Sequence, residues 1–201
     1  MNIIILGGFL GSGKTTTLLS LAHYIVDNST SDSEFKVMII ENEVGEIGID
    51  DSFISSSGLQ VNTLFSGCAC CTLSGELTVA VQNMQNEFNP DWIILETTGV
   101  AYPRSMQENL EHAVKARAKI MVLADVNRFE RQMRAMEQLI VDQIEGSDAV
   151  MVNKIDLADD EMIATVEARV RSIEPNTAVH LVCAQQGIDD AVWQSLIGNE
   201  V

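Results

Sequence analysis

The chain has 201 residues, of which 46% are hydrophobic, and its formal net charge at pH 7 is −17. This length and hydrophobic content predict one domain, residues 1–201, because no linker rich in Pro, Gly or Ser divides the chain. A surface this acidic repels phosphate backbones, so we expect no nucleic acid partner. We expect a cytoplasmic protein with no membrane partner, since the N-terminus shows no signal peptide and its apolar run is too short to span a bilayer.

Short apolar segments alternate along the chain with longer segments of helical periodicity. Most of the apolar segments lack polar alternation, as is typical of strands covered on both faces, and they lie at 2–6, 36–41, 92–96, 119–124, 149–153 and 178–183. The predicted helices lie at 14–27, 73–88, 103–114, 128–144, 159–173 and 189–196. This order predicts an α/β fold of three layers around a doubly wound, mostly parallel sheet. Segment 43–66 is the least regular and predicts mobile loops, with 59–65 as a further strand candidate.

The first predicted strand leads into GFLGSGKT, which fits the P-loop pattern G-x-x-x-x-G-K-[ST] and opens the first predicted helix. Glycines permit backbone angles that turn N–H groups onto phosphates, and the helix N-terminus adds a favourable dipole. The residues predicted to bind the nucleotide here are Gly8, Gly11, Ser12, Gly13, Lys14, Thr15 and Thr16. We expect Lys14 to bridge the outer phosphates as a catalytic residue and the Thr15 hydroxyl to help hold magnesium.

The second predicted strand is followed by an acidic loop, ENEVGEIGIDD at 41–51, in which glycines separate the carboxylates. Two interpretations stay open. The loop is either a nucleotide-sensing switch that also lends ligands to a metal, with Glu43 as an extra zinc ligand, or a polar loop without a role in binding.

Three cysteines, Cys68, Cys70 and Cys71, lie just before the helix predicted at 73–88. In a reducing compartment such a cluster is more typical of a metal or redox site than of a disulfide framework. Thiolates this close can bind one soft divalent ion, for which zinc is the leading candidate. The fourth ligand could come from Glu43, from water or from a partner. The alternatives are small buried residues at a helix start and a redox dithiol.

The third predicted strand ends in an acid, Glu96, and is followed by TTG. Phosphoryl transfer requires positioning and charge neutralisation more than covalent chemistry. We therefore expect Glu96 to hold magnesium through its water shell and the Gly99 N–H to meet the γ-phosphate, both as catalytic residues. The alternative for Glu96 is a solvated strand end.

A guanine-reading motif, NKID, directly follows the apolar strand residues 149–152 and comprises Asn153, Lys154 and Asp156. The Asp156 carboxylate could accept from the ring N1–H and the amine of guanine, a pair of donors that adenine lacks. Cys183 and Ala184, at the end of the next strand, are expected to back the base. GTP hydrolysis is therefore the expected activity. An ordinary turn, a P-loop small-molecule kinase and a non-catalytic metal or redox module are the alternatives.

Five segments together resemble the CobW-like metallochaperone GTPases, relatives of HypB and UreG among the SIMIBI-class P-loop GTPases. The segments lie at 7–16, 41–50, 67–73, 96–99 and 153–156, and GCACC is the most specific of them. The resemblance implies GTP/GDP and Mg²⁺ as cofactors and a low intrinsic rate of hydrolysis. It implies zinc or another transition metal at Cys68, Cys70 and Cys71, delivered to a client metalloprotein or metalloenzyme, with Cys71 also near the nucleotide.

Many members of that family continue into a C-terminal domain, whereas this chain stops after its last predicted helix. We therefore expect a single P-loop GTPase domain without that extension. A purely structural metal site and an accessory role in cobalamin biosynthesis stay open, as does a nucleotide-dependent homodimer.

Overall fold

The computed structural model describes residues 1–29, 37–41 and 74–198. Predictions that fall on 42–73 lie outside the described residues: the strand candidate 59–65, the acidic loop beyond Glu41, and the proposed zinc ligands Glu43, Cys68, Cys70 and Cys71.

A six-stranded sheet forms the centre of the fold, with the strand order β2-β3-β1-β4-β5-β6. The strands are β1 (Asn2–Gly8), β2 (Val37–Glu41), β3 (Trp92–Glu96), β4 (Ala118–Asp125), β5 (Ala149–Asn153) and β6 (Ala178–Val182). All five pairings between these strands are parallel, so the predicted sheet is confirmed and is wholly parallel in the described chain.

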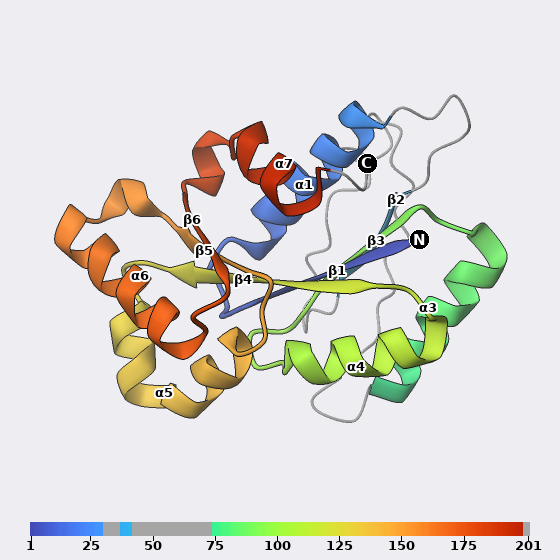
Figure 1. The fold of residues 1–201 in the computed structure, drawn as a ribbon, viewed down its shortest axis with the longest axis horizontal. Helices are drawn as coiled ribbons and strands as arrows, with labels where there is room; N and C mark the ends of the chain where they lie inside the picture. The colour runs from blue at the N-terminus through green and yellow to red at the C-terminus, as the bar shows by residue number, and fades with distance from the viewer. Residues whose placement is uncertain (30–36, 42–73, 199–201) are drawn as a thin grey trace.

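Helices cover both faces of the sheet and complete the three predicted layers. Helices α1 (Lys14–Asn28) and α7 (Asp190–Ile197) lie on one face, and α3 (Ser74–Phe88), α4 (Pro103–Val114), α5 (Phe129–Ile144) and α6 (Asp160–Ile173) lie on the other (Figure 1). Each face has its own apolar core, because consecutive strand residues point to opposite sides. Every described α-helix and strand lies within two residues of its predicted bounds, and two short 3-10 helices, Ile155–Leu157 and Ala184–Gln186, were not predicted.

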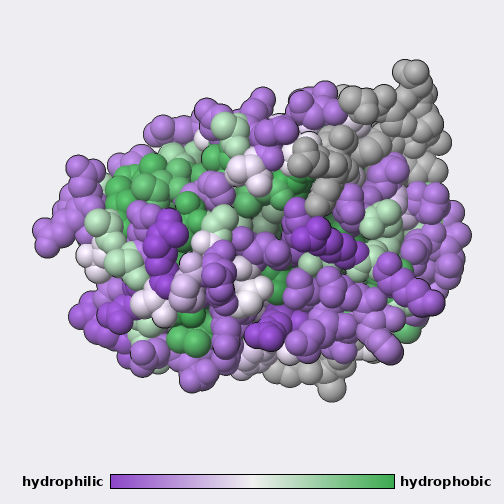
Figure 2. Space-filling model, viewed as in Figure 1, coloured by the Kyte–Doolittle hydropathy of each residue, from purple (hydrophilic) through white to green (hydrophobic). Residues whose placement is uncertain are grey.

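The sheet is buried along most of its strands, as their continuous apolar runs predict. Of the two edge strands, β2 is buried at Val37–Ile40, whereas four of the five residues of β6 are exposed or half-buried and Leu181 is 43% exposed. Figure 2 shows a mainly hydrophilic surface with an apolar area over this edge. Among the described helices, none is long and apolar enough to cross a membrane.

Two features of the chain place polar groups at one end of the sheet. The register pairs Leu6 with Glu96 and Asp125 with Asn153, so the carboxyl ends of neighbouring strands meet at one edge. Acidic residues then start two of the helices beyond that edge: Asp159 caps α6 and Asp189 caps α7 through their side-chain oxygens. In doubly wound folds ligands bind at this edge of the sheet.

Candidate nucleotide site

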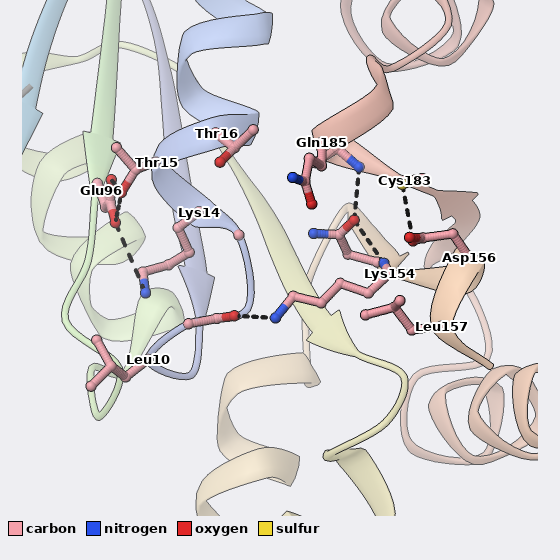
Figure 3. A pocket seen from close by; sticks show the side chains of 14 residues that line it. Leu10, Lys14, Thr15, Thr16, Glu96, Lys154, Asp156, Leu157, Cys183 and Gln185 are labelled. Atoms are coloured by element: carbon pink, nitrogen blue, oxygen red, sulfur yellow. Dashed lines mark hydrogen bonds and ion pairs between the residues drawn. The ribbon is translucent and has the colours of Figure 1, made fainter.

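A cavity of about 520 Å³ opens at the carboxyl ends of the strands (Figure 3). It is lined by Leu10, Gly11, Gly13, Lys14, Thr15, Thr16, Glu96, Asn153, Lys154, Asp156, Leu157, Cys183, Ala184 and Gln185. The structure therefore brings most of the predicted nucleotide-binding residues to one cavity, although they come from three distant parts of the sequence. Gly8, Ser12 and Gly99 are not among the lining residues, and Leu10, Leu157 and Gln185 line the cavity without having been predicted.

The glycine-rich loop has the backbone that its sequence predicts. Gly8, Gly11 and Gly13 have φ angles of 126°, 76° and 104°, which side chains other than glycine rarely adopt. A Cβ atom on Gly13 would also collide with the Asn153 amide. Helix α1 begins at Lys14 with no side-chain cap, so the first N–H groups of the helix have no partner from a capping side chain. This end of the cavity is a site for an anion.

The buried side chains of Lys14 and Glu96 and the half-buried Thr15 form a polar cluster beside that anion site. The Thr15 hydroxyl lies 3.2 and 3.1 Å from the two carboxylate oxygens of Glu96, and Lys14 Nζ lies 3.9 Å from Glu96 Oε1 (Figure 3). Glu96 is only 4% exposed, so the alternative of a solvated strand end is wrong. A hydroxyl and a carboxylate are the hard oxygen donors that magnesium prefers, and they fit the predicted Mg²⁺ site.

The segment after Glu96 lies against the glycine-rich loop. The Thr97 hydroxyl and backbone N–H both donate to the Leu6 carbonyl at 3.0 Å, which fixes the end of β3 to the end of β1. Two residues on, a Cβ atom added to Gly99 would lie 2.8 Å from the backbone nitrogen of Leu10. Only glycine therefore fits at position 99, and its backbone stands next to the phosphate end of the cavity.

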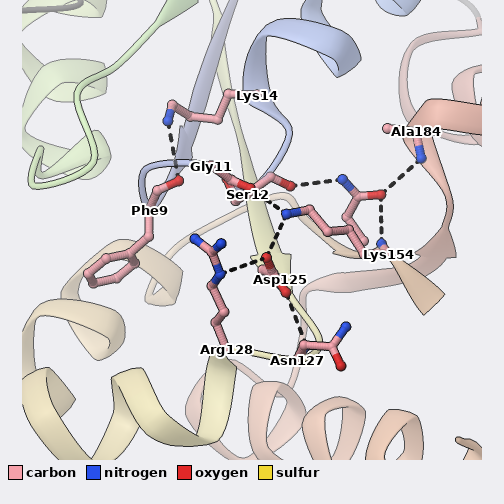
Figure 4. A network of polar contacts seen from close by, with 10 residues as sticks. Phe9, Gly11, Ser12, Lys14, Asp125, Asn127, Arg128, Lys154 and Ala184 are labelled. Atoms are coloured by element: carbon pink, nitrogen blue, oxygen red, sulfur yellow. Dashed lines mark hydrogen bonds and ion pairs between the residues drawn. The ribbon is translucent and has the colours of Figure 1, made fainter. Parts of the chain in front are cut away.

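Asn153 joins three loops and directs both ends of its amide to the protein backbone. Its Nδ2 donates to the Ser12 carbonyl at 2.8 Å, and its Oδ1 accepts from the N–H groups of Lys154 and Ala184 at 2.8 and 2.9 Å (Figure 4). At 2% exposure it has little surface left for a base. The structure thus places this predicted guanine-binding residue where it holds the loops together.

Lys154 crosses the cavity from the base end to the phosphate end. Its Nζ donates to the Gly11 carbonyl at 2.6 Å and to Asp125 Oδ2 at 2.7 Å (Figure 4). Asp125 is 3% exposed, and it also lies 3.6 Å from Arg128 Nε and accepts from the Asn127 N–H at 3.1 Å. Asp125 is the functional residue that sequence reasoning missed, although β4 ends in an acid just as β3 does.

The far end of the cavity contains Asp156 beside Cys183. Asp156 is exposed, and its Oδ1 accepts from the Cys183 thiol at 3.0 Å. Leu157, Ala184 and Gln185 line the same end. Asp156 is therefore a carboxylate open to the cavity, as the guanine prediction requires.

The residues that the structure describes do not offer an alternative zinc site. Within the described ranges, no group of three or more His, Cys, Asp or Glu side chains could hold a metal ion. The predicted ligands Glu43, Cys68, Cys70 and Cys71 lie outside those ranges, so the zinc site stays a prediction.

Comparison with known proteins identifies one family and several of its members as similar to this chain. Residues 2–180 match the model of the family described as CobW/HypB/UreG, nucleotide-binding domain. "Zinc-regulated GTPase metalloprotein activator 1" of Dictyostelium discoideum is 26% identical over 86% of this chain and 44% of its own length. "Zinc chaperone YjiA" of Escherichia coli is 30% identical over 83% of this chain and 55% of its own length. The chain thus spans about half the length of these relatives.

Solved structures show the same fold. The hydrogenase maturation factor HypB from Archaeoglobus fulgidus superposes with a TM-score of 0.70 over 100% of this chain and 91% of that one, at 16% sequence identity. At this level of identity the likeness establishes the P-loop α/β fold.

Proposed function

The chain belongs to the CobW/HypB/UreG nucleotide-binding domain family, and on that premise we propose that it is a GTPase that couples GTP hydrolysis to the delivery of a metal ion. The reaction is the hydrolysis of GTP to GDP and phosphate. The cargo is zinc or another transition metal, and the recipient is a client metalloprotein. Two named relatives support the cargo, since one is a zinc chaperone and the other a zinc-regulated GTPase.

The observation that carries the proposal is a single cavity with a phosphate cradle at one end and a base-reading carboxylate at the other. Lys154 spans the two ends from the NKID loop to the Gly11 carbonyl. A bound nucleoside triphosphate would therefore contact both loops at once. The fixed contacts of Asn153 hold the loops in place before ligand binds, which reduces the ordering cost of binding.

Guanine is the base that this site favours. The Asp156 carboxylate could accept from both the N1–H and the 2-amino group of guanine. Adenine offers an acceptor at N1 and no 2-amino group, so the carboxylate would be left without donors. Binding of GDP much tighter than ADP supports this proposal, and equal affinity for the two would favour the small-molecule kinase instead.

The hydrolysis step relies on positioning. Lys14 would neutralise the outer phosphates from its buried position, and Thr15 and Glu96 would hold magnesium directly or through its water shell. Magnesium, when bound, neutralises charge that develops on the β- and γ-phosphates. Gly99 would offer its backbone N–H to the γ-phosphate from its place against Leu10.

The route from nucleotide to metal would run through the end of β2. Glu41, the last residue of β2, pairs with Glu96 in the sheet register, so β2 ends beside the proposed magnesium ligand. The segment that follows in the sequence carries Glu43, Cys68, Cys70 and Cys71. A change at Glu96 on hydrolysis would act at the start of that segment. The γ-phosphate would favour one arrangement of the metal ligands and GDP another, and the ion would be released to the client in the second state.

The deciding experiment is zinc affinity by chelator competition, with GDP and with a non-hydrolysable GTP analogue. We expect the two affinities to differ by more than about tenfold, which corresponds to a coupling of about 1.4 kcal/mol. By reciprocity, zinc should then change the affinity for the GTP analogue relative to GDP by the same factor. Cys68→Ser serves as the control and should lose zinc while retaining nucleotide. Equal zinc affinity in both states would contradict metal delivery and favour a structural metal site on a GTPase.

We also propose that pairing of two copies of the chain depends on the nucleotide state. Light scattering in each nucleotide state tests the pairing, and a single mass in both states would contradict it.

A further inference from the structure

A buried glutamine contacts the segment that we expect to recognise the γ-phosphate. Gln143 is the penultimate residue of α5, is 2% exposed, and shares the buried face of that helix with Met133, Ile140 and Ile144. Its Nε2 donates to the Gly99 carbonyl at 3.0 Å and to the Ala101 carbonyl at 3.4 Å. Burial of an amide costs free energy unless it is hydrogen-bonded, so an apolar residue would be the simpler choice for packing alone.

The segment contacted by Gln143 is a closed turn held between two surfaces. The Ala101 N–H donates to the Thr98 carbonyl at 3.1 Å, which closes the turn over residues 98–101. On its other side, the Gly99 backbone stands so close to Leu10 that no Cβ atom would fit. Gly99 thus has the phosphate loop on one side and the Gln143 amide bonded to its carbonyl oxygen.

The hydrogen bond to the Gly99 carbonyl constrains a residue that is otherwise free to rotate. Glycine has no side chain to restrict its φ and ψ angles, so external contacts must set the direction of its peptide groups. Thr97 anchors the start of the segment on Leu6, and Gln143 anchors the middle and the end. The Gly99 N–H belongs to the Thr98–Gly99 peptide, whose carbonyl accepts from the Ala101 N–H, and Gln143 holds the two carbonyls that follow. Together these bonds give the Gly99 N–H one preferred direction before nucleotide binds.

We propose that Gln143 is a positioning residue for γ-phosphate recognition and that it sets how strongly the site prefers GTP over GDP. This inference rests on the proposed function, in which Gly99 donates its N–H to the γ-phosphate. Only the triphosphate reaches that N–H. Loss of the Gln143 contacts should therefore weaken GTP binding and hydrolysis and leave GDP binding unchanged.

Two substitutions separate the donor from the volume of the side chain. Gln143→Met keeps the length and fills the space but leaves the two carbonyls without a donor. Gln143→Glu keeps the shape but turns a carboxylate toward two carbonyl oxygens, so its effect should be larger. The matched control is Gln138→Glu on the same helix, because Gln138 is exposed and its side chain donates to Asp142 there.

The test measures the dissociation constants for GDP and for a non-hydrolysable GTP analogue, both with magnesium, and the single-turnover rate of GTP hydrolysis. For Gln143→Met we expect GDP affinity within about twofold of wild type and analogue affinity lower by about fivefold, the value of one neutral hydrogen bond. The rate should fall by at least the same factor. Gln138→Glu should match wild type in all three.

The outcomes distinguish failure of the proposed function from failure of this inference. If wild type binds no guanine nucleotide, the proposed function is wrong and this inference with it. If wild type binds both nucleotides and Gln143→Met weakens both equally, or neither, the inference alone is wrong. Thermal unfolding of each variant is recorded first. If Gln143→Met does not fold, Gln143→Asn, which keeps the amide but is one methylene shorter, gives the same comparison.

Discussion

The thiol of Cys183 donates a hydrogen bond to Asp156 Oδ1 at 3.0 Å, at the end of the cavity where we expect the guanine base. The hydrogen bond to the Asp156 carboxylate raises the pKa of the Cys183 thiol above its ordinary value, and burial adds to the shift. The thiol is therefore protonated at neutral pH, and it occupies an oxygen that guanine would need.

This contact predicts how Cys183 reacts with iodoacetamide. Alkylation requires the thiolate, so its rate should rise with pH to a midpoint above that of a free cysteine. Asp156→Asn removes the charge that disfavours the thiolate, so the midpoint should move to lower pH and the rate at a fixed pH should rise. Mass spectrometry of the Cys183 peptide measures the rate. An unchanged midpoint in Asp156→Asn would contradict the hydrogen bond between Cys183 and Asp156. In wild type, saturating GDP should slow the alkylation of Cys183.

The proposed role of Asp156 in base recognition gives a second prediction. Asp156→Asn exchanges a carboxylate for an amide with one acceptor and one donor group, so GDP affinity should fall by roughly 10- to 100-fold, the range for a charged hydrogen bond. Xanthine has an oxygen where guanine has its 2-amino group, so affinity for XDP should rise in the variant. Isothermal titration with both nucleotides checks this, with Asp160→Asn on the exposed start of α6 as the control. A parallel loss of both nucleotides would argue against base reading.

Glu96→Gln tests the magnesium site. The amide keeps the volume of the buried side chain and can still bond Thr15, but it removes the charge near Lys14 and the preferred ligand for magnesium. We expect GTP hydrolysis to slow by roughly 100-fold, by analogy with the loss of one strong electrostatic contact in a catalytic site, and half-saturation to require more magnesium. Phosphate release measured across a magnesium titration gives both values. A wild-type rate and magnesium dependence would remove Glu96 from the catalytic residues.

Asp125→Asn tests the ion-pair network beneath the phosphate loop. The substitution leaves Lys154 and Arg128 without their shared carboxylate at a site where Asp125 is 3% exposed. Breaking a fully buried pair costs about 3–5 kcal/mol. Because Lys154 is 29% and Arg128 49% exposed, solvent screens part of that loss. We expect unfolding free energy to drop by about 1–3 kcal/mol in urea titration. Asp142→Asn on α5, whose carboxylate accepts a hydrogen bond from the exposed Gln138, should change the unfolding free energy by less than about 0.5 kcal/mol.

The fold was predictable from the sequence because parallel strands buried on both faces are continuous apolar runs, and the helices between them have clear periodicity. The glycine-rich loop and NKID were predictable because each packs its residues into a few consecutive positions. The spacing of the residues within each motif follows from local backbone geometry, so it can be recognised from the sequence alone.

The remaining parts of the site depend on contacts across the fold. Asn153 was predicted to meet the base, but its amide is used by Ser12, which lies 141 residues away in the chain. The sequence does not distinguish Gln143 from the other polar residues of its helix, because its hydrogen-bond partner Gly99 is 44 residues away. Asp125 was left out because the strand was expected to end one residue earlier. A single sequence does not record which distant backbone groups need a partner.

The strand order has a consequence for synthesis of the chain on the ribosome. Strand β1 is made first, yet it lies between β3 and β4, so Asn2–Gly8 has no neighbour in the sheet until Trp92 and then Ala118 have emerged. At roughly 5–20 residues per second, this apolar segment waits on the order of 10 seconds for its first neighbour. Nascent chains that stop before Trp92 should therefore bind chaperones through this segment, and release should begin once β3 has left the exit tunnel.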